Sequence, residues 1–319
     1  MGILNQIIWL MMKQTDIIII GAGPSGMMSA IYAKRANKEV ILLDKASPGG
    51  SLHSTFQVDN YLGFGKVSAE ELIQKMVDHL RDLEIEDTKG FVNQITKEKD
   101  YFIVATEKET YFAKAVIVAS GTSPKPLKVP NEFELLSKGI SYCAVCDGLF
   151  FENEDVVVIG GGDSALEESI YLSHICKSVT IIHELKEFTA SKGLIKRIQE
   201  HDKISVKLST KVIEFIGNEE LDAITLLDCF NNITYDFKAK GAFIYIGNQA
   251  DTTYINNLLI TDESGFIPVN QFMETKVKGL FACGDVTKKD FRYIVTAISD
   301  GAIAALSAVK YLDDSRNLE

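Results

Sequence analysis

The sequence predicts an α/β fold of two Rossmann-like dinucleotide-binding domains, each of three-layer ββα type, with the second domain inserted into the first. Three observations predict it. A β-branched strand, Ile17–Ile20, leads into the glycine-rich stretch Gly21–Gly26. A second apolar strand, Val156–Ile159, leads into the similar stretch Gly160–Ala165. A late block, 279–285, is too small for a domain, so we expect it to return to the first domain and complete it.

The first domain is expected to cover 12–124 and 249–319. A helical run from Met27 to Arg35 follows the glycines, and the next strand, Val40–Leu43, ends in Asp44. An acid about 20 residues after a G-x-G-x-x-G turn is typical of a dinucleotide site. The glycines let the backbone approach a pyrophosphate at the helix N-terminus, and the acid accepts hydrogen bonds from a ribose.

We expect the remainder of the first domain to be a structural scaffold. Apolar residues recur at helical spacing from Ser68 to Leu83, with Ser68 as N-cap and Glu71 at the capping-box position. Residues 90–112 alternate as antiparallel strands do, and a buried strand at 115–119 closes on Gly121. The proline-containing segment that follows breaks the chain and marks the domain boundary.

The second domain, 125–248, repeats the first pattern. Aligning Gly21 with Gly160 places Ile31-Tyr32 on Ile170-Tyr171 and Val40 on Val179. Self-similarity over such a separation predicts two dinucleotide modules in one chain.

Composition narrows the class of protein. The chain has 319 residues, a formal net charge of −11 and five cysteines. An acidic surface disfavours nucleic acid and anionic membrane as partners. Sparse, odd-numbered cysteines suit a reducing cytoplasm, where a disulfide is catalytic. The apolar segment near the start is too short to span a bilayer, and we treat 1–11 as an N-terminal extension.

The stretch Tyr142–Gly148 holds the most reactive chemistry. Cys143 and Cys146 are spaced to close a small disulfide ring, and Asp147 could exchange a proton with the leaving thiolate. Two other readings compete. A zinc site needs four ligands, whereas the other cysteines are scattered singly and the histidines form no pair. Two inert buried cysteines remain the second alternative. We predict no metal site.

Two dinucleotide modules and a Cys-x-x-Cys suggest an electron path from a nicotinamide through a flavin to a disulfide. From about Asp16 to Leu312 the chain resembles the low-molecular-weight thioredoxin reductases. The most specific feature is Cys143–Gly148, placed just before the second glycine motif. In lipoamide-dehydrogenase-like flavoproteins the redox cysteines lie inside the FAD module instead.

The resemblance implies a homodimeric, FAD-dependent enzyme that reduces thioredoxin or a related small redox protein, with a small domain that rotates. It implies that Cys146 faces the flavin, Cys143 exchanges with the substrate disulfide and Asp147 protonates the dithiol. It places the FAD contacts at Gly21, Gly23, Pro24, Ser25, Gly26, Asp44, Gly50, Ser51, Leu52, Asn60, Gly121, Gly284, Asp285, Arg292, Tyr293 and Ile294. The nicotinamide dinucleotide contacts would be Gly160, Gly162, Asp163, Ser164, Ala165, His183 and Glu184.

One departure concerns the electron donor. Where the family's NADPH version has His-Arg-Arg and a further Arg, this chain reads His183–Ala190 without arginine. A 2′-phosphate is usually clamped by arginine, and Glu184 would repel it. We therefore expect NADH as the donor. NADPH is less favoured, although Lys186 or Lys192 could still contact a phosphate.

Two further departures lie near the flavin ring: Tyr293 replaces the family's Gln after Arg292, and Ser51 replaces a Gln after Gly50. Three other functions stay open. A flavin dithiol oxidase, or a reductase fed by a protein carrier such as ferredoxin, would explain the missing arginines. A non-catalytic flavoprotein would have no need of a disulfide beside an acid.

Overall fold

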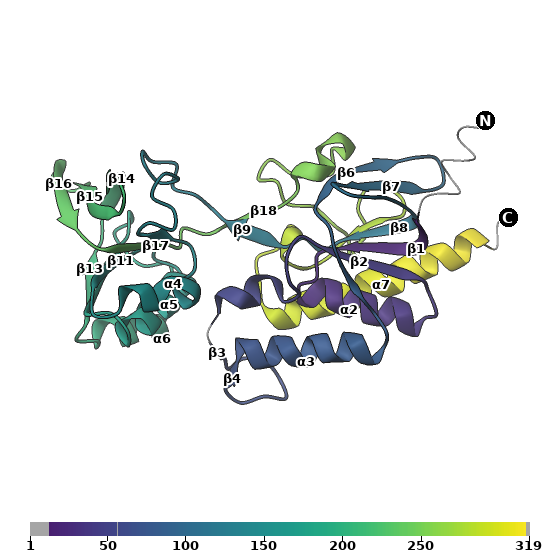
Figure 1. Cartoon of the computed structure of the whole chain (residues 1–319), viewed down its shortest axis with the longest axis horizontal. Coiled ribbons are helices and arrows are strands. Elements are labelled where there is room, and N and C mark those ends of the chain that lie inside the picture. Colours follow the sequence, from purple (N-terminus) through teal and green to yellow (C-terminus); the bar gives the residue numbers. More distant parts are fainter. Residues whose placement is uncertain (1–12, 56, 317–319) are drawn as a thin grey trace. The chain divides into compact units, whose positions relative to one another are not determined.

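The structure is a computed structural model that describes residues 13–55 and 57–316; the predicted extension at 1–11 lies outside them. The chain divides into two compact units, and each is described by itself. Unit 1 runs to Ser123 and resumes at Gln249, and unit 2 is Pro124–Asn248. The two connecting segments, β9 (Thr122–Pro124) and β18 (Asn248–Ala250), pair as a two-stranded ribbon (Figure 1).

Unit 1 is built on a seven-stranded sheet of order β5-β2-β1-β8-β7-β6, with β19 also paired to β8. Its strands are β1 (Lys13–Ile20), β2 (Val40–Asp44), β5 (Asp87–Lys89), β6 (Val92–Lys97), β7 (Phe102–Thr106), β8 (Thr110–Val118) and β19 (Leu280–Ala282). β8 pairs antiparallel with β7 near its start and parallel with β19 near its end. The expected return of the late block to the first module is therefore confirmed.

Helices cover one face of this sheet. They are α2 (Pro24–Arg35), α3 (Ala69–Asp82) and α7 (Ile294–Arg316), and the short segments β3 (Gln57–Val58), β4 (Val67–Ser68), η1 (Gly50–Ser54), η3 (Thr253–Leu258) and η4 (Gly284–Val286) complete the unit. α2 and α7 pack on the sheet through one apolar cluster, and β6, β7 and η3 enclose a second cluster on the other face. The layers are thus ββα, as predicted. The Ser68 hydroxyl accepts a hydrogen bond from the Glu71 N–H at 3.1 Å, which confirms the expected N-cap.

Unit 2 repeats these layers around a parallel five-stranded sheet of order β10-β17-β11-β12-β13. Its elements are β10 (Ile140–Ser141), α4 (Ala144–Asp147), η2 (Gly148–Phe151), β11 (Asp155–Ile159), α5 (Asp163–Ser173), β12 (Ser178–Ile182), α6 (Lys192–Gln199), β13 (Ile204–Lys207), β14 (Thr210–Gly217), β15 (Leu221–Asp228), β16 (Ile233–Lys238) and β17 (Gly241–Ile244). α5 and α6 pack on one face of the sheet, and the antiparallel β14-β15-β16 sheet covers the other. The two Rossmann-like modules expected from the repeat are present.

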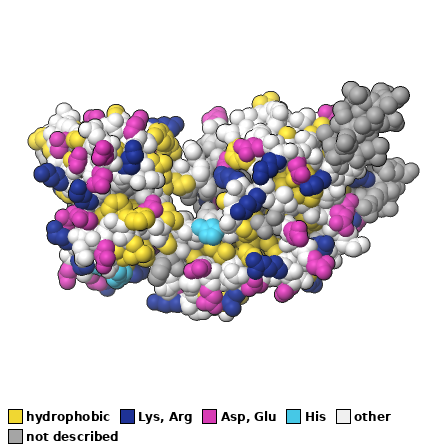
Figure 2. Space-filling model, in the orientation of Figure 1, with side chains coloured by type: hydrophobic (Ala, Val, Ile, Leu, Met, Phe, Trp, Pro, Cys, Tyr) yellow, Lys and Arg dark blue, Asp and Glu magenta, His cyan; other side chains and the backbone are white. Residues whose placement is uncertain are grey.

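Surface charge and the long helix α7 bear on possible partners. On the face drawn in Figure 2, acidic and basic side chains are interspersed over both units.

Among the described residues α7 alone has the length and mean hydropathy, 1.3, that could cross a membrane. Ala304, Ala305 and Ala308 of this helix are fully buried against the unit 1 core.

Candidate functional site

The first glycine turn joins β1 to α2 so tightly that side chains are excluded. Gly21 has φ +108°, and a Cβ added there would lie 2.2 Å from the Ala119 carbonyl oxygen. A Cβ on Gly26 would lie 1.7 Å from the Gly21 carbonyl oxygen. The turn therefore presents bare backbone at the N-terminus of α2, where the helix dipole favours a phosphate.

Asp44, at the end of β2, is tied to this turn. Its Oδ2 accepts a hydrogen bond from the Ala22 N–H and its Oδ1 one from the Ala46 N–H. It borders a pocket within unit 1 whose lining comes from three strand ends and from the chain after β18. The lining residues are Ile20, Gly21, Leu43, Asp44, Lys45, Gly90, Phe91, Val92, Ser120, Asp251 and Tyr254.

Sequence reasoning did not identify Asp251 in this pocket. Its carboxylate pairs with Lys45, and its carbonyl oxygen accepts a hydrogen bond from the Ser120 hydroxyl at 2.8 Å. These contacts bring the segment after β18 to the first glycine turn. No local sequence motif signals them.

A second loop approaches the same turn. Gly50 has φ +57°, and a Cβ there would lie 3.1 Å from the Gly23 Cα. Leu52 is buried in a small cluster under this loop, whereas Ser51 and Asn60 are exposed. The structure thus brings Gly23 and Gly50 together, as a shared ligand would require.

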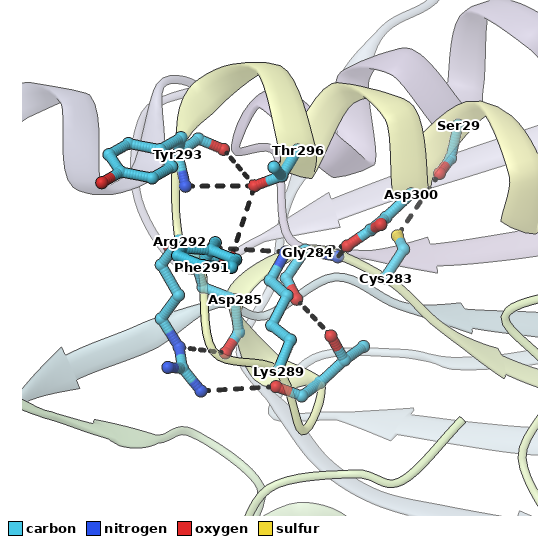
Figure 3. Close-up of polar contacts among 11 residues, drawn as sticks. Ser29, Cys283, Gly284, Asp285, Lys289, Phe291, Arg292, Tyr293, Thr296 and Asp300 are labelled. Carbon is cyan, nitrogen blue, oxygen red and sulfur yellow. Dashed lines mark hydrogen bonds and ion pairs between the residues drawn. The ribbon is translucent and has the colours of Figure 1, made fainter. Parts of the chain in front are cut away.

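The third part of the unit 1 site is the η4 segment, drawn in Figure 3. Gly284 has φ +74°, and a Cβ on it would lie 2.4 Å from the Ser25 hydroxyl oxygen. The Asp285 Oδ1 atom is buried and has no hydrogen-bond partner in the described structure. Arg292 donates to the Asp285 carbonyl oxygen at 3.4 Å, and the Tyr293 side chain is half exposed. The ion pair of the Asp285 carboxylate with the Lys289 Nζ atom, at 3.7 Å, is too long for a hydrogen bond, so Asp285 Oδ1 can still accept one from a polar ligand.

In unit 2 the glycine turn has the same backbone but different surroundings. Gly160 has φ +143°, and a Cβ there would lie 2.2 Å from the Tyr245 carbonyl oxygen. His183 directly follows β12, and its ring lies against Gly161, where a Cβ would lie 2.5 Å from the ring. Burial lowers the pKa of His183 and leaves its Nε2 atom without a partner in the described structure. Glu184, the next residue, is exposed.

The loop after Glu184 folds back onto the turn. Thr189 donates to the Gly161 carbonyl oxygen through its N–H at 2.9 Å and through its hydroxyl at 3.2 Å. The Asp163 carboxylate accepts a hydrogen bond from the Ser191 N–H at 2.7 Å. The stretch where the family carries arginines is therefore closed here by internal hydrogen bonds.

Cys143 and Cys146 form a disulfide at α4. The Cys146 N–H donates to the Cys143 Sγ atom at 3.1 Å. Such a bond stabilises a thiolate at Cys143 once the disulfide is reduced. Cys146 is the more exposed of the two residues.

Asp147 is held by the strand that precedes the disulfide. The Ser141 hydroxyl donates to the Asp147 Oδ2 atom at 2.6 Å and accepts a hydrogen bond from the Cys143 N–H at 2.9 Å. Ser141 therefore links the acid to the backbone of the disulfide ring. The structure brings the predicted trio together: Cys143 is the N-cap of α4, and Cys146 and Asp147 lie within it.

Two partly buried side chains near the disulfide, Tyr245 and Glu168, were not foreseen. The Ala144 N–H donates to the Tyr245 hydroxyl at 2.8 Å. Burial raises the pKa of Tyr245, and the Glu168 carboxylate raises it further. Burial also raises the pKa of Glu168 to about 8, and its Oε2 atom has no hydrogen-bond partner in the described part of the chain. Burial therefore favours the neutral form of Glu168.

Comparison with known proteins identifies the family. Residues 15–301 match the family of pyridine nucleotide-disulphide oxidoreductases. The chain belongs to this family. It is 41% identical over 304 residues to the thioredoxin reductase of Bacillus subtilis, covering 95% of this chain and 96% of that protein. This disulfide oxidoreductase is therefore of the low-molecular-weight thioredoxin reductase type and FAD-dependent.

Two solved structures add detail. Lactococcus lactis thioredoxin reductase, in its FR conformation, has a TM-score of 0.92 and 37% identity, covering 94% of this chain and 99% of that one. A ferredoxin-flavin thioredoxin reductase from Clostridium acetobutylicum has a TM-score of 0.54 and 28% identity, covering 95% of this chain and 99% of that one.

The residues of unit 1 fit FAD. The glycine turn, with no side chain at Gly21 and Gly26, suits a pyrophosphate, and the acid at Asp44 suits a ribose. The Asp285 Oδ1 atom, which has no hydrogen-bond partner in the described structure, suits a polyhydroxyl chain. When bound, FAD supplies two-electron transfer between a hydride donor and a disulfide. The family also implies a nicotinamide cofactor.

Proposed function

We propose that this enzyme takes electrons from NADH and passes them through FAD and the Cys143–Cys146 disulfide to thioredoxin or a similar small redox protein. The observation that carries the proposal is the disulfide of α4 with Asp147 beside it. One NADH and one proton supply two electrons, which convert the disulfide to a dithiol. The dithiol then reduces the substrate disulfide, and the Cys143–Cys146 bond forms again.

The side chains around the disulfide support separate roles. Asp147, oriented by the Ser141 hydroxyl, donates the proton that the departing thiolate needs. Cys143, whose Sγ accepts the Cys146 N–H, carries the stabilised thiolate and exchanges with the substrate, while Cys146 faces the flavin. Cys146 is, however, the more exposed of the two cysteines. If a mixed disulfide with the substrate is trapped on Cys146 rather than on Cys143, the two roles are reversed.

A protein substrate is favoured by the surface next to the disulfide. Leu149 and Phe150 follow Asp147 directly and are 69% and 81% exposed. Large apolar side chains exposed together mark a contact for another protein. Thioredoxin reductases of similar sequence support thioredoxin as that protein. A small dithiol, the substrate of a dithiol oxidase, would not need such a surface.

NADH is favoured over NADPH by the loop after β12. Glu184 is exposed beside the turn, and a carboxylate there can accept hydrogen bonds from a ribose diol but repels a 2′-phosphate. Thr189 bonds to Gly161 instead of offering a cation. Lys186 and Lys192 remain exposed near the loop, so NADPH is the minor donor in this proposal.

A second candidate is electron supply by a protein carrier. The same arginine-free loop favours it, and the similar Clostridium acetobutylicum protein is a ferredoxin-flavin thioredoxin reductase. We further propose a homodimeric, cytoplasmic enzyme, as the family resemblance implies.

Steady-state reduction of a thioredoxin disulfide tests the donor. Parallel assays would contain NADH, NADPH or chemically reduced ferredoxin at equal concentration. We expect the kcat/KM for NADH to exceed that for NADPH by about 10-fold or more, the size of one charged contact. A preference for NADPH would contradict the donor assignment. Turnover only with ferredoxin would favour the second candidate.

A further inference from the structure

Lys289 is an almost buried cation between η4 and α7. Its side chain is 17% exposed, and its Nζ atom lies 2.7 Å from Asp300 Oδ2 and 3.7 Å from Asp285 Oδ1. Figure 3 shows the ammonium between the two acids. Lysine is buried in proteins almost only when it is paired, and removing one member of such a pair leaves an uncompensated charge.

Asp300 joins this cation to the backbone of η4. Its Oδ2 atom, besides pairing with Lys289, accepts the Gly284 N–H at 3.2 Å. Gly284 in turn lies against Ser25 in the first turn of α2, where a Cβ on Gly284 would lie 2.4 Å from the Ser25 hydroxyl. Asp300 therefore fixes η4 from the side of α7, at the place where it meets the glycine turn.

The Asp285 carboxylate is the group that this arrangement holds in place. Burial raises the pKa of Asp285, and Asp300 raises it further, while Lys289 and Arg292 oppose both effects. Thr287 and Arg292 hold the η4 backbone: the Thr287 hydroxyl donates to the Gly284 carbonyl oxygen at 2.8 Å, and Arg292 donates to the Asp285 carbonyl oxygen. Without Lys289, Asp300 would lose its ion-pair partner, and Arg292 alone would oppose the effects of burial and of Asp300 on Asp285.

We propose that Lys289 and Asp300 are positioning residues for FAD, which hold the Gly284 N–H and the Asp285 carboxylate in the arrangement that binds the cofactor. Neither residue belongs to the glycine motifs or to the disulfide. The inference rests on FAD binding in unit 1 and is independent of the choice between NADH, NADPH and a protein donor. Loss of the pair should weaken FAD binding and leave the dithiol chemistry of FAD-saturated enzyme in place.

The test measures FAD affinity by flavin fluorescence, from release on dilution of the holoenzyme and from rebinding. Lys289→Met and Asp300→Asn should each weaken FAD binding by about 10-fold or more, as expected for cutting a buried charged pair. Lys288→Met is the matched control: Lys288 is the adjacent lysine, 66% exposed, and pairs with Asp262 outside this cluster. Its FAD affinity should stay within about twofold of wild type.

A double-variant cycle separates positioning from general damage. Because the two residues act as a pair, Lys289→Met combined with Asp300→Asn should lose less affinity than the product of the single losses. Lys289→Arg should recover most of the affinity lost in Lys289→Met. The proposal would be overturned if Lys289→Met bound FAD with an affinity within twofold of wild type. It would also be overturned if the losses in FAD affinity from Lys289→Met and Asp300→Asn were fully independent. If Lys289→Met does not fold, Asp300→Asn decides by the same criterion.

Discussion

The two glycine turns share one backbone and differ at the end of the following strand. Gly21 and Gly160 both have positive φ, and a Cβ on either would lie 2.2 Å from a strand carbonyl oxygen. With these glycines aligned, the position of Asp44 in unit 1 is occupied by His183 in unit 2. Asp44 bonds the Ala22 N–H of its turn, whereas His183 packs its ring on Gly161, and the acid, Glu184, comes one residue later.

This difference separates the glycine turn, which can bind any dinucleotide, from the end of the following strand, which we expect to select one dinucleotide over another. The side-chain-free turn is required by close backbone approach, so both units keep it. We expect the residue at the end of that strand to contact the ribose, and at this position the two units differ. In unit 1 Asp44 is hydrogen-bonded to the turn, whereas Glu184 of unit 2 is exposed.

The largest expected effect is on disulfide reduction, when a cysteine of the unit 2 disulfide is replaced. Cys143→Ser and Cys146→Ser should each lower disulfide reduction by at least about 1,000-fold, because no second thiol can reform the bond. FAD content, measured by absorbance, should be unchanged, since its predicted contacts lie in unit 1. Cys229→Ser, which removes an exposed free cysteine of unit 2, is the control. A serine variant with full turnover would refute the assignment.

Exchanging one glycine in each turn tests whether the units bind different cofactors. Gly21→Ala should weaken FAD binding by more than about 100-fold, because both its φ and its contact with Ala119 exclude a Cβ. Gly160→Ala should raise the KM for NADH by a similar factor and retain FAD. Gly193→Ala, where a Cβ meets nothing within 4 Å, should change neither. Loss of FAD in Gly160→Ala alone would break the comparison.

Much of this organisation follows from local sequence. The strand, glycine turn and helix of both modules, the Ser68 cap and the return of β19 were predicted and are confirmed. Contacts between residues far apart in the sequence could not be predicted, because no local sequence pattern indicates them. Tyr245 reaches Ala144 across 101 residues, and Asp251 reaches Lys45 across 206. The roles of the individual ligand contacts stay predictions.

A smaller effect is expected at the strand end of unit 2. Glu184→Gln should lower kcat/KM for NADH by about 10-fold, because a charged acceptor for a ribose hydroxyl is lost. Kinetics with NADH and NADPH on the same preparation would measure it. Glu187→Gln, exposed in the same loop, should leave both values unchanged. An equal response in the two variants would argue against a specific contact at Glu184.

The last effect is on stability rather than on activity and concerns Glu168, the partly buried acid near the disulfide. In the folded state burial raises the pKa of Glu168 from 4.5 to about 8, so folding retains a proton that the unfolded chain releases above pH 4.5. The free energy of unfolding of unit 2 should therefore fall as pH rises from about 4.5 to 8. Glu168→Gln cannot ionise, so its stability relative to wild type should rise over that window, by at most about 1.4 kcal/mol per pH unit.

Urea denaturation at several pH values would measure this difference. Glu219→Gln, at an exposed acid of unit 2 away from α5, serves as the control and should show no such trend. A pH-independent difference between Glu168→Gln and wild type would contradict a neutral Glu168.

The most direct test of the electron path is an anaerobic titration of the FAD-containing enzyme with NADH and, separately, NADPH, following flavin absorbance. The account predicts prompt bleaching by NADH at near-stoichiometric amounts and a much weaker response to NADPH. If neither nucleotide bleaches the flavin while a dithiol does, nicotinamide does not feed this enzyme, and the central claim is contradicted.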